Sequence, residues 1–127
     1  MKYKLLLILI LLFCTDPYTS FANEIFDIND IKIAQEHAEK TNTKLILVFT
    51  ADWCKYCVYL HDEIEENIEL VNTKYTVCYV DYDSNKNLVS RYKVGPIPTS
   101  IILDGDVYKK IVGFSNFNNY SRILDLK

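Results

Sequence analysis

The chain has 127 residues, of which 50% are hydrophobic and 24% are charged, and its formal net charge is −3 at pH 7. This length is typical of one domain, and the balance of apolar and charged residues excludes an intrinsically disordered chain. A mildly acidic chain without a basic stripe gives no reason to expect a nucleic-acid partner.

The first 22 residues differ in composition from the rest of the chain. Lys2 and Lys4 precede an apolar run over residues 5–13, and small residues, the last of them Ala22, stand before a possible cleavage site. This pattern is typical of a secretory signal peptide, because the apolar run is too short to span a bilayer. We therefore expect residues 1–22 to be a signal peptide.

Cleavage after Ala22 would leave residues 23–127 as a single mature domain with a net charge of −4. A domain of this size can bury one core without a dense set of disulfides. Cleavage would also remove Cys14 and leave three cysteines, an odd number that does not suggest a disulfide framework. The alternatives are an uncleaved anchor, a buried helix, or a lipoprotein cleaved at Cys14.

Hydrophobic periodicity predicts helices and strands in alternation along the mature domain. The first elements expected are a helix capped by Asn29 or Asp30 that ends near residues 41–42, a strand at 44–50, and an amphipathic helix that starts at the cysteines and carries Cys57, His61, Ile64 and Ile68 on one face. A strand at 75–81 should follow, then a short helix capped by Ser84, strands at 99–103 and 107–112, and a last helix within 116–126. The long strand–helix–strand connection implies parallel strands, and the Asp104-Gly105-Asp106 turn implies an antiparallel hairpin.

The segment "TADWCKYC" places Cys54 and Cys57 where a strand gives way to a helix. A cysteine in the first helical turn lies near unpaired N–H groups and the positive end of the helix dipole, which favour the thiolate. Two intervening residues bring Cys57 to the same side, so that a disulfide can form and reopen. Trp53 would add an apolar wall and Lys55 a positive charge. The arrangement suits thiol–disulfide exchange in which Cys54 attacks and Cys57 resolves the mixed disulfide.

Other uses of a CxxC pair are less consistent with the sequence. A structural zinc site needs about four ligands, and only His61, His37 and Cys78 are present as scattered additions to the pair. Covalent haem attachment needs a histidine directly after the second cysteine, where this chain has Val58. A plain structural disulfide remains an alternative. We expect His37 to be a partly exposed helix residue and Cys78 a small buried apolar residue.

These motifs together resemble the thioredoxin-fold thiol–disulfide oxidoreductases over nearly the whole mature domain. "KLILVFT" leading into "ADWCKYC" resembles the active-site entry of that family, "YKVGPIPTSIIL" resembles its cis-proline loop, and Gly113 matches a glycine of its final strand. The resemblance implies an α/β thioredoxin fold with a central four-stranded mixed sheet flanked by helices. It also implies a cis peptide between Ile97 and Pro98, and a loop of Ile97, Pro98 and Thr99 that binds the substrate peptide. A trans Pro98 that opens an edge strand is the alternative.

Within the family, "ADWC" followed by a long charged helix most resembles exported reductases and the C-terminal domain of DsbD, a periplasmic electron-transfer protein. Two positions depart from that pattern. Val48 stands where the family has a buried aspartate that helps to move the proton of the second cysteine, and His61 stands where the DsbD domain has a glutamate. Our hypothesis is that His61 accepts the proton of Cys57, since the ordinary histidine pKa of about 6.5 suits this role. A purely structural histidine is the alternative.

The resemblance thus predicts an exported, periplasmic thiol–disulfide oxidoreductase that reduces disulfides of envelope proteins. Its catalytic residues would be Cys54 and Cys57, supported by Trp53, Lys55, Tyr56 and His61. It would need no metal and no organic cofactor, receive electrons from a membrane thiol protein, and act as a monomer. Lys55-Tyr56 help to tune the reduction potential, but the sequence leaves its value open. An oxidase or isomerase, a chaperone-like binding module and a specialised partner of cytochrome c assembly are alternatives.

Overall fold

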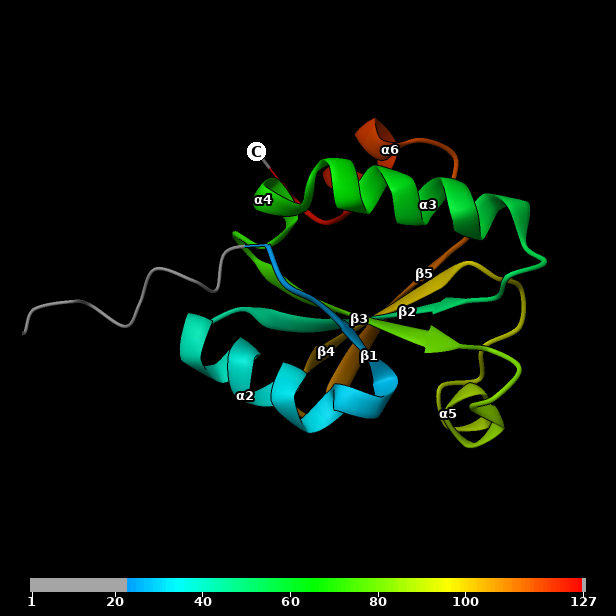
Figure 1. The fold of residues 1–127 in the computed structure, drawn as a ribbon, viewed down its shortest axis with the longest axis horizontal. Coiled ribbons are helices and arrows are strands. Elements are labelled where there is room, and N and C mark those ends of the chain that lie inside the picture. The colour runs from blue at the N-terminus through cyan, green and yellow to red at the C-terminus, as the bar shows by residue number, and fades with distance from the viewer. Residues whose placement is uncertain (1–22, 127) are drawn as a thin grey trace, which may run out of the picture.

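The computed structural model describes residues 23–126, so the expected signal peptide lies outside the described residues. Within them, one mixed sheet has the strand order β1-β3-β2-β4-β5 (Figure 1). Its strands are β1 (Ile25–Asp27), β2 (Lys44–Thr50), β3 (Tyr75–Asp81), β4 (Thr99–Asp104) and β5 (Val107–Val112). β3 pairs in parallel with β1 and β2, whereas β4 pairs antiparallel with β2 and β5. The predicted α/β class and mixed sheet are confirmed, but the described sheet has five strands and not four.

The strand that the prediction missed is β1. It has three residues, too few to show the period-2 alternation that identifies a strand in a sequence. It is defined by its partner, because Ile25 and Phe26 lie opposite Val77 and Cys78 of β3. Pairing with a neighbour, and not local sequence, therefore makes this segment a strand.

Helices cover both faces of the sheet. They are α2 (Ile31–Thr41), α3 (Lys55–Glu66), α4 (Ile68–Val71), α5 (Lys86–Arg91) and α6 (Phe117–Ile123), with a 3₁₀ turn, η1 (Ile28–Asp30), before α2. Figure 1 shows α3, α4 and α6 on one side of the sheet and α2 on the other. The order of strands and helices otherwise follows the prediction.

Alternate side chains of β2 point to opposite faces of the sheet, so this strand contributes to two hydrophobic cores. Ile46 and Val48 pack in the cluster beneath α3 and α6, whereas Leu45, Leu47 and Phe49 pack in the cluster beneath α2. Each of these five side chains is buried. A near-continuous apolar run is expected when both faces of a strand are covered, so "KLILVFT" is confirmed as a central strand.

Three local expectations were wrong. Ser84 does not cap α5; its backbone N–H donates to Asp81 Oδ1 at 2.7 Å, and Asn85 holds the cap position. His37 is buried, at 7% exposure, because its Nδ1 lies 3.1 Å from Thr76 Oγ1 and gives the ring a polar partner inside the fold. The helix that begins at the cysteines ends at Glu66, so Ile68 belongs to α4.

The break between α3 and α4 occurs at Asn67. Its side-chain amide donates to the carbonyl oxygen of Glu63 at 2.8 Å, and its backbone N–H also contacts that oxygen. Asparagine competes well for backbone groups in this way, which favours helix ends over helix interiors. The chain therefore turns after twelve helical residues.

The strand directions bring three loops to one edge of the sheet. β2 ends at this edge and leads to Cys54, whereas the antiparallel β4 begins there directly after Ile97 and Pro98. β5 returns to the same edge after the predicted hairpin, whose Gly105 has a φ of +61°, and ends before Gly113. The loop residues singled out from the sequence therefore converge in space.

Candidate active site

Cys54 and Cys57 form a disulfide at the start of α3, with their Cα atoms 5.2 Å apart. Cys54 is the N-cap residue of this helix and has an extended backbone conformation. The backbone N–H of Cys57 donates to Cys54 Sγ at 3.3 Å. In the reduced protein, this N–H and the positive end of a twelve-residue helix would stabilise a Cys54 thiolate.

The disulfide is recessed below the surface. Cys54 is 7% exposed and Cys57 only 2%, and both pack with Ala51, Tyr82 and Ile97. A partner sulfur can therefore approach Cys54 more easily than Cys57. This difference fits the order of roles expected for the two cysteines, in which Cys54 reacts first with a partner.

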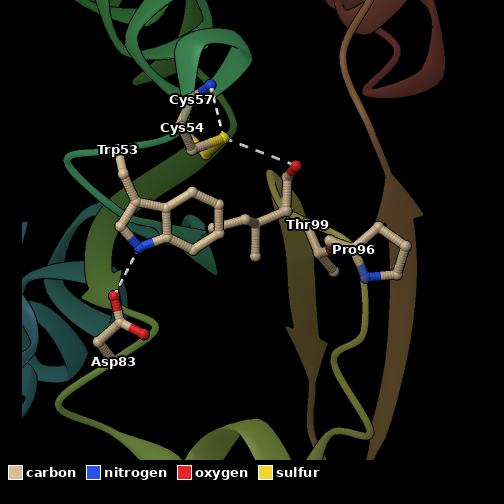
Figure 2. The surroundings of a disulfide bond; sticks show 7 residues. Trp53, Cys54, Cys57, Asp83, Pro96 and Thr99 are labelled. Atoms are coloured by element: carbon tan, nitrogen blue, oxygen red, sulfur yellow. Dashed lines mark hydrogen bonds between the residues drawn. A yellow bond between two sulfur atoms is a disulfide. The ribbon is translucent and has the colours of Figure 1, made fainter.

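The loop before β4 lies directly beside the disulfide, as Figure 2 shows. The peptide bond between Ile97 and Pro98 is cis, and the carbonyl oxygen of Ile97 lies 3.7 Å from Cys54 Sγ. Two hydrogen bonds hold the loop: Gly113 N–H donates to the Pro98 carbonyl at 2.8 Å, and the Thr99 hydroxyl donates to the Pro96 carbonyl at 2.6 Å. The structure thus brings the predicted peptide-binding loop and the cysteines together.

Trp53 is 69% exposed and lies on the rim of the site. Its indole N–H donates to Asp83 Oδ2 at 2.8 Å (Figure 2). Asp83 also pairs with Lys86 at 3.3 Å. The Lys86 ammonium lies 4.3 Å from the centre of the Tyr82 ring, which itself packs on the disulfide. These contacts fix the indole beside Cys54.

Asp83 was not singled out from the sequence. The signal that could have found it is its position just after β3, because the carboxyl ends of the parallel strands β2 and β3 meet at the same edge. A polar residue in that place is near whatever follows β2, here Trp53. Its partnership with an indole nitrogen, however, depends on loop geometry.

Lys55 and Tyr56, the two residues between the cysteines, point outward. Tyr56 is 59% exposed and meets Tyr59 edge to face, with ring centres 6.2 Å apart. The Lys55 ammonium lies 5.5 Å from the centre of the Tyr59 ring. The first turns of α3 therefore present an aromatic surface next to the disulfide.

His61 lies one helical turn after Cys57 and is partly buried. Its ring stacks on Tyr79 with centres 4.7 Å apart, and its Nε2 lies 3.3 Å from Glu65 Oε1. Nδ1 lies 3.8 Å from Asp62 Oδ1. The imidazole therefore stands between a ring in the fold and two carboxylates at the surface, a setting compatible with proton transfer.

Val48, at the position where the family carries an aspartate, is fully buried and lies opposite Tyr79 in the β2–β3 pairing. Within the described residues, the buried Tyr79 hydroxyl has no hydrogen-bond partner. Burial raises the pKa of Tyr79 well above its ordinary value, and Glu65 contributes to the shift. The phenol therefore stays neutral, and the space below α3 holds no carboxylate at position 48.

Cys78 lies in the cluster on the α2 face of the sheet and is 0% exposed. Burial, with smaller contributions from Asp27 and Asp30, raises the pKa of its thiol to about 12. The expectation of a buried apolar role is confirmed. Among residues 23–126, no group of three or more metal-ligating side chains is present, and no helix is both long and apolar enough to cross a membrane.

Comparisons with known proteins agree with this geometry. Residues 31–127 match a family model described as a thioredoxin-like domain. Mitochondrial thioredoxin of Rattus norvegicus is 28% identical over 99 residues, 77% of this chain, and the chain spans 60% of the length of that relative. Thioredoxin of Staphylococcus epidermidis is 33% identical over 78 residues, 61% of this chain and 75% of that protein.

Solved structures show the same fold. The germline-specific thioredoxin Deadhead of Drosophila melanogaster matches with a TM-score of 0.67 at 23% identity, covering 82% of this chain and 98% of that one. Thioredoxin of Trypanosoma brucei brucei matches with a TM-score of 0.65 at 21% identity, covering 84% and 94%. At such identities the likeness concerns the arrangement of the backbone.

Proposed function

We propose, from the premise that this chain belongs to the family of thioredoxin-like domains, that it is a thiol–disulfide oxidoreductase acting on protein disulfides. The observation that carries the proposal is the Cys54–Cys57 disulfide at the start of α3, with the Ile97 carbonyl 3.7 Å from Cys54 Sγ. A purely structural disulfide would not need an exposed indole and the predicted peptide-binding loop beside it.

In the reducing direction the reaction consists of two exchanges. The Cys54 thiolate attacks one sulfur of a partner disulfide; a mixed disulfide forms, and the other partner sulfur leaves as a thiolate that takes up a proton. The thiolate of Cys57 then attacks Cys54 Sγ, which forms the Cys54–Cys57 disulfide and releases the second partner thiol. Two electrons and two protons pass from the protein to its partner. A dithiol protein must supply two electrons and two protons to restore the starting state.

The loop of Ile97, Pro98 and Thr99 would hold the partner during these steps. Its backbone lies beside Cys54 and is anchored through Gly113 and Pro96. An extended peptide that pairs with this loop would bring its disulfide to Cys54 Sγ. Such positioning lowers the entropic barrier of a reaction between two chains.

His61 would serve the second step. Cys57 is almost fully buried and must lose its proton to attack, but Val48 offers no carboxylate below it. His61 follows Cys57 by one turn and pairs with Glu65, which supports a role as the proton acceptor.

The proposed setting is the bacterial envelope, with reduction as the physiological direction. The composition of residues 1–22 supports export, and the resemblance of "ADWC" and α3 to the C-terminal domain of DsbD supports a reductase fed by a membrane thiol protein. We further propose that the mature protein acts as a monomer through its disulfide alone, without a metal or an organic cofactor.

Turnover of a protein disulfide tests the proposed activity. The full chain, supplied with dithiothreitol, should reduce insulin disulfides at a rate well above that of dithiothreitol alone. Cys54→Ser should abolish this activity, and Cys57→Ser should trap a mixed disulfide with the partner. Cys78→Ala is the matched control, since Cys78 is buried on the other face, and should retain activity.

The Cys54→Ser variant also separates the activity from a holdase function. A chaperone-like module that binds unfolded chains would prevent their aggregation equally well without Cys54. If the wild-type protein does not reduce insulin while both proteins suppress aggregation, the oxidoreductase proposal is wrong and the binding module is favoured.

A further inference from the structure

Large apolar side chains are exposed next to the disulfide, just before α3 and in its first turns. Trp53, Tyr56, Val58 and Tyr59 are four of the large apolar side chains that are exposed in the described part of the chain, at 69%, 59%, 48% and 46%. Burial of such side chains against a partner would remove apolar surface from water. Because these side chains lie close to a recessed disulfide, a redox partner that reaches the disulfide would bury them.

The aromatic residues continue into an acidic stretch on the same side of the helix. At 100° per residue, Lys55, Tyr56, Tyr59, Asp62, Glu63 and Glu66 fall within about a third of the helix circumference. We call this surface the α3 stripe; it consists of those six residues. Five of its residues are exposed and Glu63 is half-buried, whereas Cys57, Leu60 and Ile64 of the same helix are buried.

The charges along the stripe change from one end to the other. Lys55 stands at the disulfide end, against the Tyr59 ring, and the three carboxylates stand beyond Tyr59. Asp62 Oδ1 lies 3.8 Å from His61 Nδ1. Among the described residues, Glu63 and Glu66 form no ion pair. A partner with positive charge at that end would therefore meet unneutralised carboxylates.

We propose that the α3 stripe selects redox partners with a particular sequence beside the reactive cysteine. On one side of that cysteine, the partner has an apolar residue next to it and basic residues further away. This inference rests on the proposed oxidoreductase function. The aromatic part of the stripe is continuous with the surface that any partner of Cys54 must contact, and its acidic part gives charge complementarity. The occupant is a segment of a partner protein, held on α3 while its disulfide reacts at Cys54.

The dimensions of the stripe set the spacing in the partner. Tyr56 and Glu66 are ten residues apart, which is about 15 Å along a helix. An extended peptide covers that length in about five residues. The basic residues should therefore lie about four to six positions from the reactive cysteine.

The test uses three synthetic peptides of equal length, each with one cysteine blocked as a mixed disulfide with 2-mercaptoethanol. One carries a tryptophan beside the cysteine and two lysines about five positions away, the second has glutamates in place of the lysines, and the third has serines at all these positions. Each design is made with the flank on either side of the cysteine. The second-order rate constant for oxidation of the reduced full chain is followed by acid quenching and mass spectrometry of the Cys54–Cys57 pair, because the tryptophan of two peptides would mask the fluorescence of Trp53, the single tryptophan of the chain.

For the wild-type protein we expect the lysine peptide to react about tenfold faster than the glutamate peptide at low ionic strength. The ratio should shrink as salt is added, because charges at an exposed surface are screened. Glu63→Gln with Glu66→Gln should reduce the ratio severalfold. Tyr59→Ser should lower the rate constants of both tryptophan peptides about fivefold relative to that of the serine peptide. This is the effect expected when a residue that contributes strongly to an interface is truncated.

Two variants away from the stripe serve as matched controls. Tyr108→Ser removes another exposed tyrosine, on β5, and Glu36→Gln removes another exposed carboxylate, on α2. Neither should change the ratios.

The outcomes distinguish a failure of the partner-selection inference from a failure of the proposed oxidoreductase function. If no peptide oxidises the reduced protein, the proposed oxidoreductase function fails. If the serine peptide reacts as fast as the lysine peptide, or if the stripe variants change the ratios no more than the controls do, the function stands and the inference about partner selection is overturned.

Discussion

At the scale of single residues, the three cysteines of the described chain differ because of their surroundings. Cys54 caps a helix and accepts an N–H hydrogen bond, Cys57 is almost fully buried, and Cys78 lies inside the opposite core. These surroundings fit the proposed roles of Cys54 in attack and Cys57 in resolution, and the packing role of Cys78. The sequence predicted the burial of Cys78 and the position of the pair at the start of a helix, whereas the roles of Cys54 and Cys57 in exchange stay predictions.

The raised pKa of Cys78 predicts a specific pH dependence of stability. An unfolded thiol titrates near its ordinary pKa of 9.0, but the folded thiol holds its proton up to about pH 12. Above about pH 9 the folded state binds more protons than the unfolded state, so this contribution to the free energy of unfolding is complete below pH 9 and is lost as the pH rises. Urea unfolding of the oxidised protein should show a smaller loss between about pH 8 and pH 10.5 in Cys78→Ala than in wild type. Equal slopes would contradict the buried thiol.

His61 gives the second prediction at this scale. If it accepts the proton of Cys57, His61→Ala should slow release of the mixed disulfide and change the pH profile of this step. Stopped-flow measurement of the release step, with a partner already bound to Cys54, isolates the role of Cys57. Glu36→Gln on α2 is the control for a distant charge change. An unchanged profile in His61→Ala would leave His61 a structural residue on Tyr79.

At the scale of elements, buried polar contacts attach α6 and its C-cap to the sheet; one joins Tyr75 to Leu124, and another joins Ser100 to Tyr120. The Tyr120 hydroxyl and Ser100 Oγ lie 2.7 Å apart, and both residues are almost fully buried. Removal of either partner leaves a buried polar group unsatisfied, which costs about 1–3 kcal/mol. Because Tyr120 packs on Phe114 as well, the apolar part of the contact survives in Tyr120→Phe.

We expect Tyr120→Phe and Ser100→Ala each to lower the free energy of unfolding by about 1–2 kcal/mol. The double variant should lose less than the sum of the two, since no unpaired group then remains. Chemical denaturation of the four proteins in one redox state measures this cycle. Additive losses would show that the two hydroxyl groups do not stabilise each other.

The elements also show which parts of the fold local sequence determines. β2, β3, β4 and β5 have six or seven residues and a clear apolar pattern, so their existence could be predicted. β1 has three residues and becomes a strand through its neighbour β3, which no local pattern reveals. The helix break at Asn67 and the cap at Asn85 depend on competition between asparagine, serine and backbone groups that the pattern alone does not decide.

At the scale of the whole molecule, the topology brings the site together. The loops after β2, before β4 and after β5 are far apart in sequence but meet at one edge of the sheet, where Cys54, Pro98 and Gly113 lie. The cysteines and the loop could be predicted because each carries its own motif. Asp83 and the α3 stripe could not, because their importance depends on which side chains share a surface.

The reduction potential of the Cys54–Cys57 pair is a property of the whole molecule. The helix dipole, the Cys57 N–H and the residues Lys55 and Tyr56 all affect the Cys54 thiolate, and their sum appears in one quantity. That quantity decides whether the protein reduces or forms disulfides in its partners.

The most direct test of the central claim is the equilibrium of the Cys54–Cys57 pair in the full chain with graded ratios of reduced and oxidised dithiothreitol and glutathione, with Cys78→Ala as the control. We expect one reversible two-electron transition, unchanged in the control, with a potential near or below the value of about −270 mV known for thioredoxin. A potential near −120 mV, typical of an oxidant, would contradict the reductase direction, and a pair that does not titrate reversibly would contradict the oxidoreductase itself.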